Sequence, residues 1–292
     1  MINIKNDSNT LSSIDKRSNL SKKEFLNEYV FPGIPVVVMD AAKNWNAMGK
    51  FTPDFFKSNY GQLIKKVKGV DYTISEFIDL MLKSSPENPA PYPFNLNVEK
   101  YFPELMKDIM PHLLYGKSDR VSNPLLPKFM LKGTEVYELF FGGNGSFFPT
   151  LHIDALYLHT QITQVYGSKE FILYGIEQSQ FMYPRSDNNK LSEVNIFNPD
   201  YEKHPLFRNA KPLKVTVNEG ETIFFPTGWW HATQIHEPCI SLGRIQLNAS
   251  NWNDFVSDNN ILWKKYNPKV APLMNAYAKM LGAFMNLQEK FI

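Results

Sequence analysis

A histidine and an aspartate, His152 and Asp154, stand two positions apart near the middle of the chain. The segment that contains them, LHIDALYLHTQITQVYG, is rich in the β-branched and aromatic residues that are typical of a strand. Because side chains of a strand point alternately to its two faces, this spacing directs both groups to the same face. If that face lines a cavity, a metal ion would offset the cost of burying an imidazole and a carboxylate together.

His231 supplies a third candidate ligand. It follows the sequence EGETIFFPTGWW, in which the turn from Pro226 to Gly228 and two bulky tryptophans fix the start of a strand. Two histidines and one carboxylate that leave other coordination positions open are typical of non-haem Fe(II) sites, where those positions receive a co-substrate and then O2. The pattern therefore predicts a metal site, although a short His-x-Asp pair taken alone is more often a surface or hydrogen-bonding feature.

Lys169 lies fifteen residues beyond Asp154 and opens a run of apolar residues, FILY, that reads as a buried strand. A buried ammonium needs an anion, and the distal carboxylate of 2-oxoglutarate is a suitable one. The alternative is a solvent-exposed lysine at the corner of a hairpin. Six aromatic residues near these candidates can form a dry wall around the site, although aromatic residues in barrel strands are usually packing residues and most of the six are expected to be plain core: Phe147, Phe148, Phe224, Phe225, Trp229 and Trp230.

Four ordered segments carry a resemblance to a known family: LHIDALYLHTQITQVYGSKEFILYG, FMYP, FNPDYEKHPLFRNA and VTVNEGETIFFPTGWWHAT. In these segments the chain resembles the JmjC-type, cupin-fold oxygenases that depend on Fe(II) and 2-oxoglutarate. The stretches NPDYEKHPLF and PTGWWH are most similar to the asparaginyl hydroxylase that acts on hypoxia-inducible factor and to its bacterial relatives. The segment PGIPVVVMDAAKNWNAMGKFTPDFFKSNYG resembles the N-terminal module of that group, so the resemblance covers most of residues 25–250.

The resemblance implies a role for each matching residue. His152, Asp154 and His231 match the family's iron ligands, and Lys169 matches the residue that anchors 2-oxoglutarate. The implied cofactors are Fe(II) and the co-substrate 2-oxoglutarate. The implied reaction is hydroxylation of a substrate carbon with O2, with release of succinate and CO2.

Two further co-substrate contacts are carried over from the family. Thr160 falls where relatives place a polar contact to 2-oxoglutarate. Relatives usually have a threonine or serine three residues before the first iron histidine, but Pro149 holds that position here, so Thr150 is the expected substitute. Gly243 stands where a polar side chain is expected, and the adjacent Arg244 adds an unexpected charge. These departures predict a rearranged co-substrate pocket.

The elements that must position these residues are mostly strands. From about Lys132 to Asn251 the chain is a series of short aromatic and β-branched runs separated by glycine, which favours a sandwich, a jelly roll or a barrel. Before this section, Ser21, Thr52 and Thr73 are predicted to cap short helices, and residues 35–39 read as a buried strand. The resemblance makes the fold a mainly β (α+β overall) double-stranded β-helix with helices at both ends.

Four regions are expected along the chain. They are a flexible lead-in over residues 1–20, an N-terminal α/β module over 21–130, the jelly-roll catalytic core over 131–251, and C-terminal helices over 252–292. In the last region, the spacing of the apolar residues predicts one shared face: Leu273, Tyr277, Leu281, Phe284 and Phe291. The resemblance implies a homodimer through these helices, although packing on the barrel would explain the same face.

Composition excludes several classes of protein. The chain has 292 residues, with 31 Lys and Arg against 29 Asp and Glu, so its net charge of +2 gives no reason to expect nucleic acid as a partner. Its single cysteine, Cys239, rules out an intrachain disulfide framework and favours a reducing compartment. No apolar run predicts a signal peptide or a membrane span. A cytoplasmic protein is therefore expected.

Alternatives to a 2-oxoglutarate-dependent oxygenase stay open. One is a cupin-like binding module with a degenerate co-substrate pocket, which would not turn over 2-oxoglutarate. Another is a cupin isomerase or a dioxygenase without co-substrate, whose metal site would have more histidines and which would have no use for Lys169. For an oxygenase, the resemblance favours a protein or peptide substrate, but small molecules and RNA bases are hydroxylated on similar scaffolds. Demethylation of N-methyl-lysine is less favoured, because no reader or zinc module accompanies the core.

Overall fold

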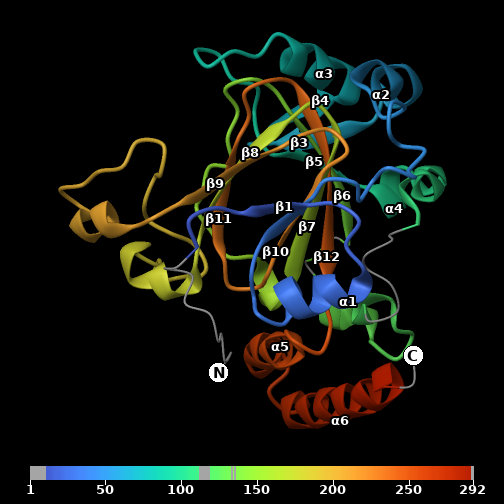
Figure 1. Cartoon of the computed structure of the whole chain (residues 1–292), viewed down its shortest axis with the longest axis vertical. Coiled ribbons are helices and arrows are strands. Elements are labelled where there is room, and N and C mark those ends of the chain that lie inside the picture. Colours follow the sequence, from blue (N-terminus) through green and yellow to red (C-terminus); the bar gives the residue numbers. More distant parts are fainter. Residues whose placement is uncertain (1–10, 112–118, 133, 135, 291–292) are drawn as a thin grey trace.

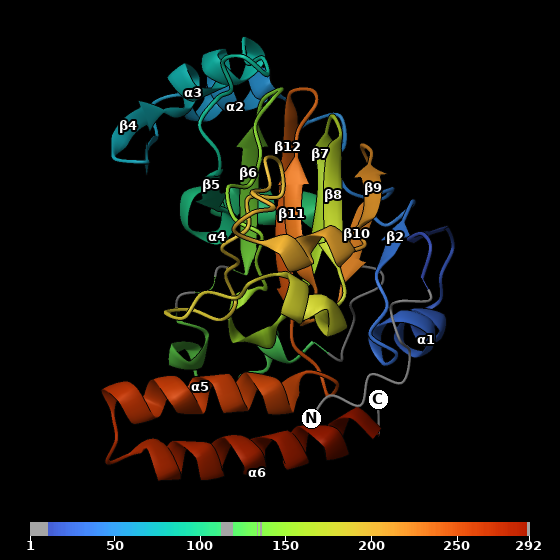
Figure 2. The same ribbon diagram turned by 90° about the vertical axis from the view of Figure 1, so that its left-hand side faces the viewer.

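A barrel of two facing β-sheets forms the centre of the protein (Figure 1). The structure is a computed structural model that describes residues 11–111, 119–132, 134 and 136–290. Figure 2 shows helices α2 and α3 at one end of the barrel and the antiparallel helices α5 and α6 at the other. This arrangement confirms the predicted jelly-roll core with N-terminal and C-terminal helices.

The larger sheet has seven strands in the order β1-β2-β10-β7-β12-β6-β5, and the smaller has the order β11-β8-β9. The strands of the larger sheet are β1 Asp15–Arg17, β2 Val36–Val38, β10 Thr222–Phe225, β7 His159–Tyr166, β12 Cys239–Gln246, β6 Tyr137–Gly142 and β5 Phe94–Asn97. Those of the smaller sheet are β11 Trp230–Gln234, β8 Lys169–Tyr174 and β9 Leu213–Val217. A separate hairpin joins β3 Ile64–Val67 to β4 Val70–Thr73.

The centre of the larger sheet is antiparallel, and its register decides which residues face the smaller sheet. Ile162 of β7 pairs with Gly243 of β12, and Gly243 pairs in turn with Glu138 of β6. Because side chains alternate along each strand, residues at these paired positions share one face of the sheet. That face is the wall of the cavity described below.

Three of the helices before the barrel begin where their caps were predicted. They are α1 Lys22–Glu24, which continues as a π-helical turn over Phe25–Val30, α2 Pro53–Tyr60 and α3 Ile74–Leu82, and a fourth helix, α4 Val98–Tyr101, follows β5. Ser21 and Thr73 form capping boxes with Glu24 and Glu76, and the Thr52 side chain accepts from the Phe55 N–H. These side chains satisfy donors that a helix leaves free at its first turn.

Helices α2 and α3 pack on the outer face of β5 and β6. The Phe56 ring lies edge-on to Phe141, 5.1 Å between centroids, and Phe77 stacks on Phe94 at 3.8 Å. Aromatic pairs of this kind bury large apolar areas and add about 0.5 to 1.5 kcal/mol each through their geometry. The outer face of β5 and β6 is thus covered, which leaves their inner face for the cavity.

The expected N-terminal lead-in is partly built into the sheet. Residues 1–10 lie outside the described residues, but β1 pairs in parallel with β2 through Asp15 and Val36, and Ile14 is buried. The expectation of a flexible segment is therefore wrong for these residues. Strands β1, β2 and β5 belong to the same sheet as the expected catalytic core, although they precede its predicted start at residue 131.

Helices α5 Trp252–Tyr266 and α6 Ala271–Lys290 form a hairpin that packs under the barrel. Trp252 and Phe255 of α5 and Leu281 of α6 are buried with Leu158 and Leu247 of the barrel. The predicted apolar face of α6 is wrong for two of its members, because Leu273 and Phe284 are 72% and 47% exposed. Tyr277 is half-buried, and Phe291 lies outside the described residues. The face that packs is instead rich in alanine and methionine, including Ala271, Ala278 and Met285.

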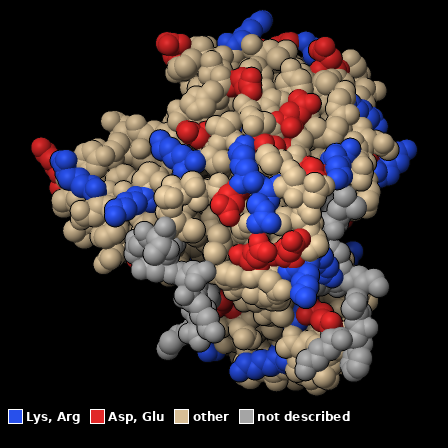
Figure 3. All heavy atoms as spheres, in the orientation of Figure 1, with Lys and Arg blue, Asp and Glu red and all other residues tan. Residues whose placement is uncertain are grey.

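The surface carries mixed charge. Figure 3 shows lysine and arginine interspersed with aspartate and glutamate over one whole face of the molecule, as the near-zero net charge predicts. Among the described residues, no helix is long and apolar enough to cross a membrane.

Candidate active site

Two histidines face each other across the mouth of the barrel. His231 lies at the second position of β11, and the His152 N–H and carbonyl form reciprocal backbone hydrogen bonds with it, 3.1 Å and 2.8 Å long. Their ring centroids are 4.1 Å apart. The predicted turn before β11 is present, and Gly228 adopts φ +88° there, a conformation that side-chain-bearing residues rarely take. The turn and the paired backbones therefore fix both imidazoles.

The segment around Asp154 is not the strand that its sequence predicts. His152 makes only isolated bridges, and Asp154 precedes a short 3₁₀ turn over Ala155–Tyr157. Leu156 and Tyr157 in this turn have left-handed backbone conformations, with φ of +57° and +50°. The strand β7 begins only at His159. The prediction that His152 and Asp154 converge is confirmed, but the cause is this turn and the pairing with β11 rather than strand alternation.

The three candidate ligands converge on one point. Asp154 Oδ1 lies 3.6 Å from His152 Nε2 and 3.7 Å from His231 Nε2, and one ligand atom of each residue lies within 4.8 Å of the others. Two donors that contact one transition-metal ion at about 2.1 Å can be at most about 4.2 Å apart, so a single ion can contact the carboxylate together with either imidazole. Within the described residues, this is the one group of three histidine, cysteine or acidic side chains that could hold a metal.

The backbone sets both imidazoles in the tautomer that a metal requires. His152 Nδ1 donates to the Thr150 carbonyl at 2.9 Å, and His231 Nδ1 donates to the Trp229 carbonyl at 3.1 Å. Because a carbonyl only accepts, the hydrogen lies on Nδ1 and the Nε2 lone pair points toward Asp154. Nitrogen and oxygen donors in this two-to-one ratio fit Fe(II), so the residues present suit the ion that the sequence predicts.

The electrostatics of the site keep the ligands ready for a cation. Burial opposes ionisation of Asp154, but His231 and His152 beside it and a hydrogen bond from the Thr160 hydroxyl lower its pKa below the ordinary value. Burial, together with the neighbouring His152, lowers the pKa of His231 to about 4. At neutral pH the carboxylate is therefore ionised and His231 is neutral, which is the state that binds metal.

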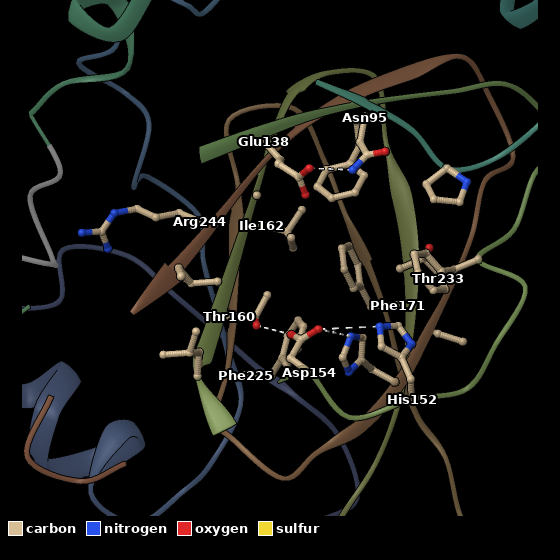
Figure 4. A pocket seen from close by; sticks show the side chains of 18 of the residues that line it. Asn95, Glu138, His152, Asp154, Thr160, Ile162, Phe171, Phe225, Thr233 and Arg244 are labelled. Carbon is tan, nitrogen blue, oxygen red and sulfur yellow. Dashed lines mark hydrogen bonds and ion pairs between the residues drawn. The ribbon is translucent and has the colours of Figure 1, made fainter. Parts of the chain in front are cut away.

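The ligands lie at one end of a cavity of about 310 Å³ between the two sheets. Figure 4 shows Asp154, His152 and Thr160 close together at this end, and Glu138 with Asn95 at the far end. Phe171 and Thr233 line the wall between them. The cavity is large enough for a small dicarboxylate beside a metal ion, since typical ligand sites begin near 300 Å³.

Lys169 reaches the same cavity from β8 and is 2% exposed. Its Nζ donates to the Tyr92 hydroxyl at 3.0 Å and lies 5.4 Å from the Tyr92 ring centroid and 5.7 Å from that of Phe140. Burial opposes its charge. Tyr92 and Cys239 raise the pKa of Lys169 above its ordinary value only where they are themselves ionised, and because burial raises the pKa of both, they are neutral at neutral pH. Within the described residues no carboxylate lies within ion-pair distance of Lys169. An aromatic cradle thus holds a buried cation without an anion.

Tyr92 was not predicted from the sequence as a site residue. It lies in the proline-rich stretch PYPF, where periodicity gives no indication of which way a side chain points. Burial raises the pKa of its phenol, so the hydroxyl is neutral at neutral pH and can both accept from Lys169 and donate to an anion. Asn95 of β5, whose amide donates to Glu138 at 2.6 Å, was also missed.

The two predicted threonines differ in their placement. Thr160 lines the cavity, as expected for a co-substrate contact, and its hydroxyl donates to Asp154. The residues that line the cavity do not include Thr150, which meets the site through its backbone carbonyl, the acceptor for His152 Nδ1. Relatives supply a hydroxyl to 2-oxoglutarate from the position that Pro149 holds here. In this structure the candidate for that hydroxyl is Tyr92 rather than Thr150.

The glycine at position 243 has a steric reason. A Cβ there would lie 2.8 Å from the edge of the Phe140 ring and 3.3 Å from Ile162 Cδ1. Phe140 is the ring beside Lys169, so the glycine makes room for the cradle. Arg244 is among the residues that line the cavity, but in Figure 4 its side chain extends away from the ligands, and it forms an ion pair with Asp119.

Aromatic rings close the wall beside the ligands. The Phe148 ring stacks on His152, 4.5 Å between centroids at 21°, and the Phe225 ring lies 4.5 Å from that of His231. Both line the cavity. Of the other four aromatic residues singled out from the sequence, Phe224, Trp229 and Trp230 lie in the core, as expected for most of the six, and Phe147 is exposed beside Phe197.

A cupin barrel with two histidines and a carboxylate at its mouth and a lysine deeper in the same cavity defines the class of JmjC-type oxygenases that use Fe(II) and 2-oxoglutarate. The chain belongs to the family described as Cupin-like domain, whose profile matches residues 59–244. This range contains all four residues that define the class, and it confirms the family and the fold that the sequence predicts.

Curated relatives agree with this assignment. The chain is 25% identical over 256 residues to "Lysine-specific demethylase JMJ21" of Arabidopsis thaliana, a match that covers 82% of this chain and 26% of that protein. It is 28% identical to "HSPB1-associated protein 1" of Homo sapiens, over 55% of this chain and 31% of that protein, and 26% identical to "Arginine-specific demethylase JMJ20" of Arabidopsis thaliana, over 85% and 59%.

The chain therefore spans between a quarter and three fifths of the length of these relatives. Their similarity supports the JmjC family, but it does not single out the asparaginyl hydroxylase group, which the sequence motifs most resembled. The similarity to that particular group is thus not confirmed.

Proposed function

We propose that this protein is an Fe(II)- and 2-oxoglutarate-dependent oxygenase that hydroxylates a carbon of its substrate. One observation carries the proposal: His152, Asp154 and His231 converge at one end of a cavity into which the buried, anion-free Lys169 also projects. A purely structural role does not explain Lys169, because a buried cation without an anion is costly to the folded protein. An anionic co-substrate that binds in the cavity does explain it.

The chain's own residues have distinct tasks in this reaction. His152, Asp154 and His231 would hold Fe(II), which supplies the activation of O2, and the Nδ1 hydrogen bonds keep both imidazoles in position. Lys169 with Tyr92 would pair with the distal carboxylate of 2-oxoglutarate. In the overall reaction, one oxygen atom of O2 enters the substrate as hydroxyl and the other enters succinate, and CO2 leaves.

A protein or peptide side chain is the favoured substrate. The relatives' names point to lysine and arginine side chains, and they make demethylation a second candidate, because hydroxylation of an N-methyl carbon releases formaldehyde. Small molecules and RNA bases stay alternatives on the same scaffold. Mass spectrometry of a cell extract treated with the protein would distinguish a +16 Da product from the 14 Da loss of a methyl group.

The main alternative is a cupin-like binding module that no longer turns over 2-oxoglutarate. One measurement distinguishes the two, namely succinate formation by the Fe(II)-loaded protein with and without O2. For the oxygenase we expect succinate only with O2, and none from Asp154→Ala or His231→Ala. The circular dichroism of both variants should be unchanged, which shows that they fold. Absence of succinate from the wild type favours the binding module, and turnover retained by either variant contradicts the triad. A cupin isomerase, or a dioxygenase without co-substrate, would leave 2-oxoglutarate intact.

A homodimer through α6 and a cytoplasmic location are also proposals. In support of the dimer, α6 exposes large apolar side chains on the side away from the barrel: Leu273, Met280, Phe284 and Leu287. Sedimentation of Met280→Glu against the control Lys279→Glu tests it: only the first variant should become a monomer, and an unchanged sedimentation coefficient contradicts the dimer.

The cytoplasmic location is supported by Cys239, which is buried and forms no disulfide.

A further inference from the structure

Helix α5 lies outside the cupin-like match, yet it holds the backbone that follows Asp154. Asp258 of α5 accepts a hydrogen bond from the Leu156 N–H at 3.1 Å. One residue before the helix, the fully buried Asn251 side chain donates to the Tyr157 carbonyl at 3.0 Å. The Leu156 side chain is buried in the apolar cluster that Trp252 helps to form. The helix and the residue that precedes it thus contact both residues of the turn that have left-handed backbones.

Those two residues need external support. A non-glycine residue in the left-handed region costs about 1 kcal/mol or more, and such conformations persist where surrounding contacts determine them. Leu156 and Tyr157 are consecutive, and the turn they form begins directly after Asp154. If the turn relaxed, the Asp154 backbone would rotate and its carboxylate would leave the point that His152 and His231 share.

A second contact reaches the other side of the ligand segment. Asp258 forms an ion pair with Lys190, whose ammonium also lies 4.5 Å from the Tyr157 ring centroid. The Lys190 carbonyl accepts from the N–H of Ile153 at 2.8 Å, and Ile153 is the residue between the first two ligands. The Lys190 and Asp258 side chains are 13% and 18% exposed, so water screens this pair little.

From these contacts we infer that Asp258 is a positioning residue for the metal centre: through Leu156 and Lys190 it fixes the ligand segment from both sides. The C-terminal hairpin then supports the metal site through Asp258, in addition to its possible role as the interface of a homodimer. The inference rests on the proposed function, in that it takes His152, Asp154 and His231 as metal ligands.

The test measures metal affinity in the full chain, with Co(II) as the probe and its visible absorption as the signal. Outer contacts that orient metal ligands are typically worth about 10- to 100-fold in affinity. Asp258→Ala is therefore expected to weaken Co(II) binding at least tenfold at temperatures well below its melting point. Asp254→Asn is the matched control, because Asp254 lies one turn earlier on α5 and is also partly buried. It should bind within twofold of the wild type.

Two milder variants decide the matter if Asp258→Ala does not fold. Lys190→Gln removes the ion pair and keeps the Leu156 hydrogen bond, and Asp258→Asn keeps an acceptor without the charge. Each is expected to bind Co(II) at least threefold more weakly. Affinity within threefold of the wild type for Asp258→Ala, or within twofold for both milder variants, overturns the inference, and so does an equal loss in Asp254→Asn.

The failure of the proposed function looks different in the same titration. If the wild type binds no Co(II), the metal site itself is wrong and the positioning role fails with it. If the wild type binds and every variant binds equally well, the metal site stands and only the role of Asp258 is lost. A fall in melting temperature without a fall in affinity also overturns the role, because it marks a purely structural contact.

Discussion

Replacing Lys169 with methionine should have opposite effects on stability and on co-substrate binding. The Lys169 side chain is 2% exposed, and its hydrogen bond goes to the hydroxyl of Tyr92. Burial raises the pKa of both Tyr92 and Cys239, so both neighbours are uncharged at neutral pH. The ammonium is therefore buried without an anion until one binds, which is costly to the free protein.

The two magnitudes follow from this environment. Removing one partner of a buried ion pair costs about 3 to 5 kcal/mol, and because the cavity opens to solvent we take the lower end, which corresponds to roughly a 150-fold weaker Kd for 2-oxoglutarate. Replacing the buried charge by an apolar group of similar volume should stabilise the free protein by about 1 to 4 kcal/mol. For a chain of this length, each kcal/mol raises Tm by roughly 2 °C.

Calorimetry measures both effects on the same samples. 2-Oxoglutarate is titrated into the Mn(II)-loaded protein, and Tm is recorded for the metal-free protein. Lys214→Met is the matched control, because Lys214 is an exposed lysine on the neighbouring strand β9, and neither value should change. A Kd within threefold of the wild type would refute the anchor role of Lys169, and a lower Tm would refute the claim that its charge is uncompensated.

Three further predictions concern Tyr92 and Gly243, which line the cavity, and the buried His159. Tyr92→Phe should raise the Kd for 2-oxoglutarate about tenfold in the same titration, since hydrogen bonds to charged groups contribute about 1.5 kcal/mol or more; an unchanged Kd would exclude the hydroxyl as a contact. Gly243→Ala should weaken 2-oxoglutarate binding severalfold while circular dichroism stays unchanged, because its Cβ would displace the Phe140 ring, and equal affinity would contradict this steric reason. Burial lowers the pKa of His159 to about 3, so the folded state resists a proton that the unfolded state takes up below about pH 6.5. Between pH 7 and pH 5 the free energy of unfolding of the wild type, measured in urea, should therefore fall by about 2 kcal/mol more than that of His159→Gln. Identical pH profiles would contradict the claim that His159 is buried in its neutral form.

The sequence predicted correctly those helices and strands whose position is set by residues a few positions away. The helices at Thr52 and Thr73 begin where their caps were predicted, because a side chain that satisfies the first free donors acts within four residues. The buried strand over Val36–Val38 is confirmed for the same reason, since its β-branched run is bounded by turn residues. Lys169 opens β8 and His231 is the second residue of β11, and the composition of both strands is equally plain.

Features that depend on distant parts of the chain were missed or misjudged. Tyr92 meets Lys169 across 77 positions, and Asp258 meets Leu156 across 102, so no local pattern relates them. The apolar face of α6 was assigned by periodicity, but Leu273 is exposed because the barrel accepts a different face of the helix. Tertiary packing, not amphipathic spacing, decides which side of a terminal helix is covered.

In the proposed function, His152, Asp154 and His231 hold iron beside a 2-oxoglutarate that Lys169 anchors. Crystals of the full chain grown without oxygen, with Fe(II) and 2-oxoglutarate, test it through the anomalous difference density at the iron edge. The structure predicts one strong peak within about 2.3 Å of the two Nε2 atoms and an Asp154 carboxylate oxygen, with the distal carboxylate of 2-oxoglutarate against Lys169 Nζ. An iron peak elsewhere, or none at these three residues, would contradict the claim.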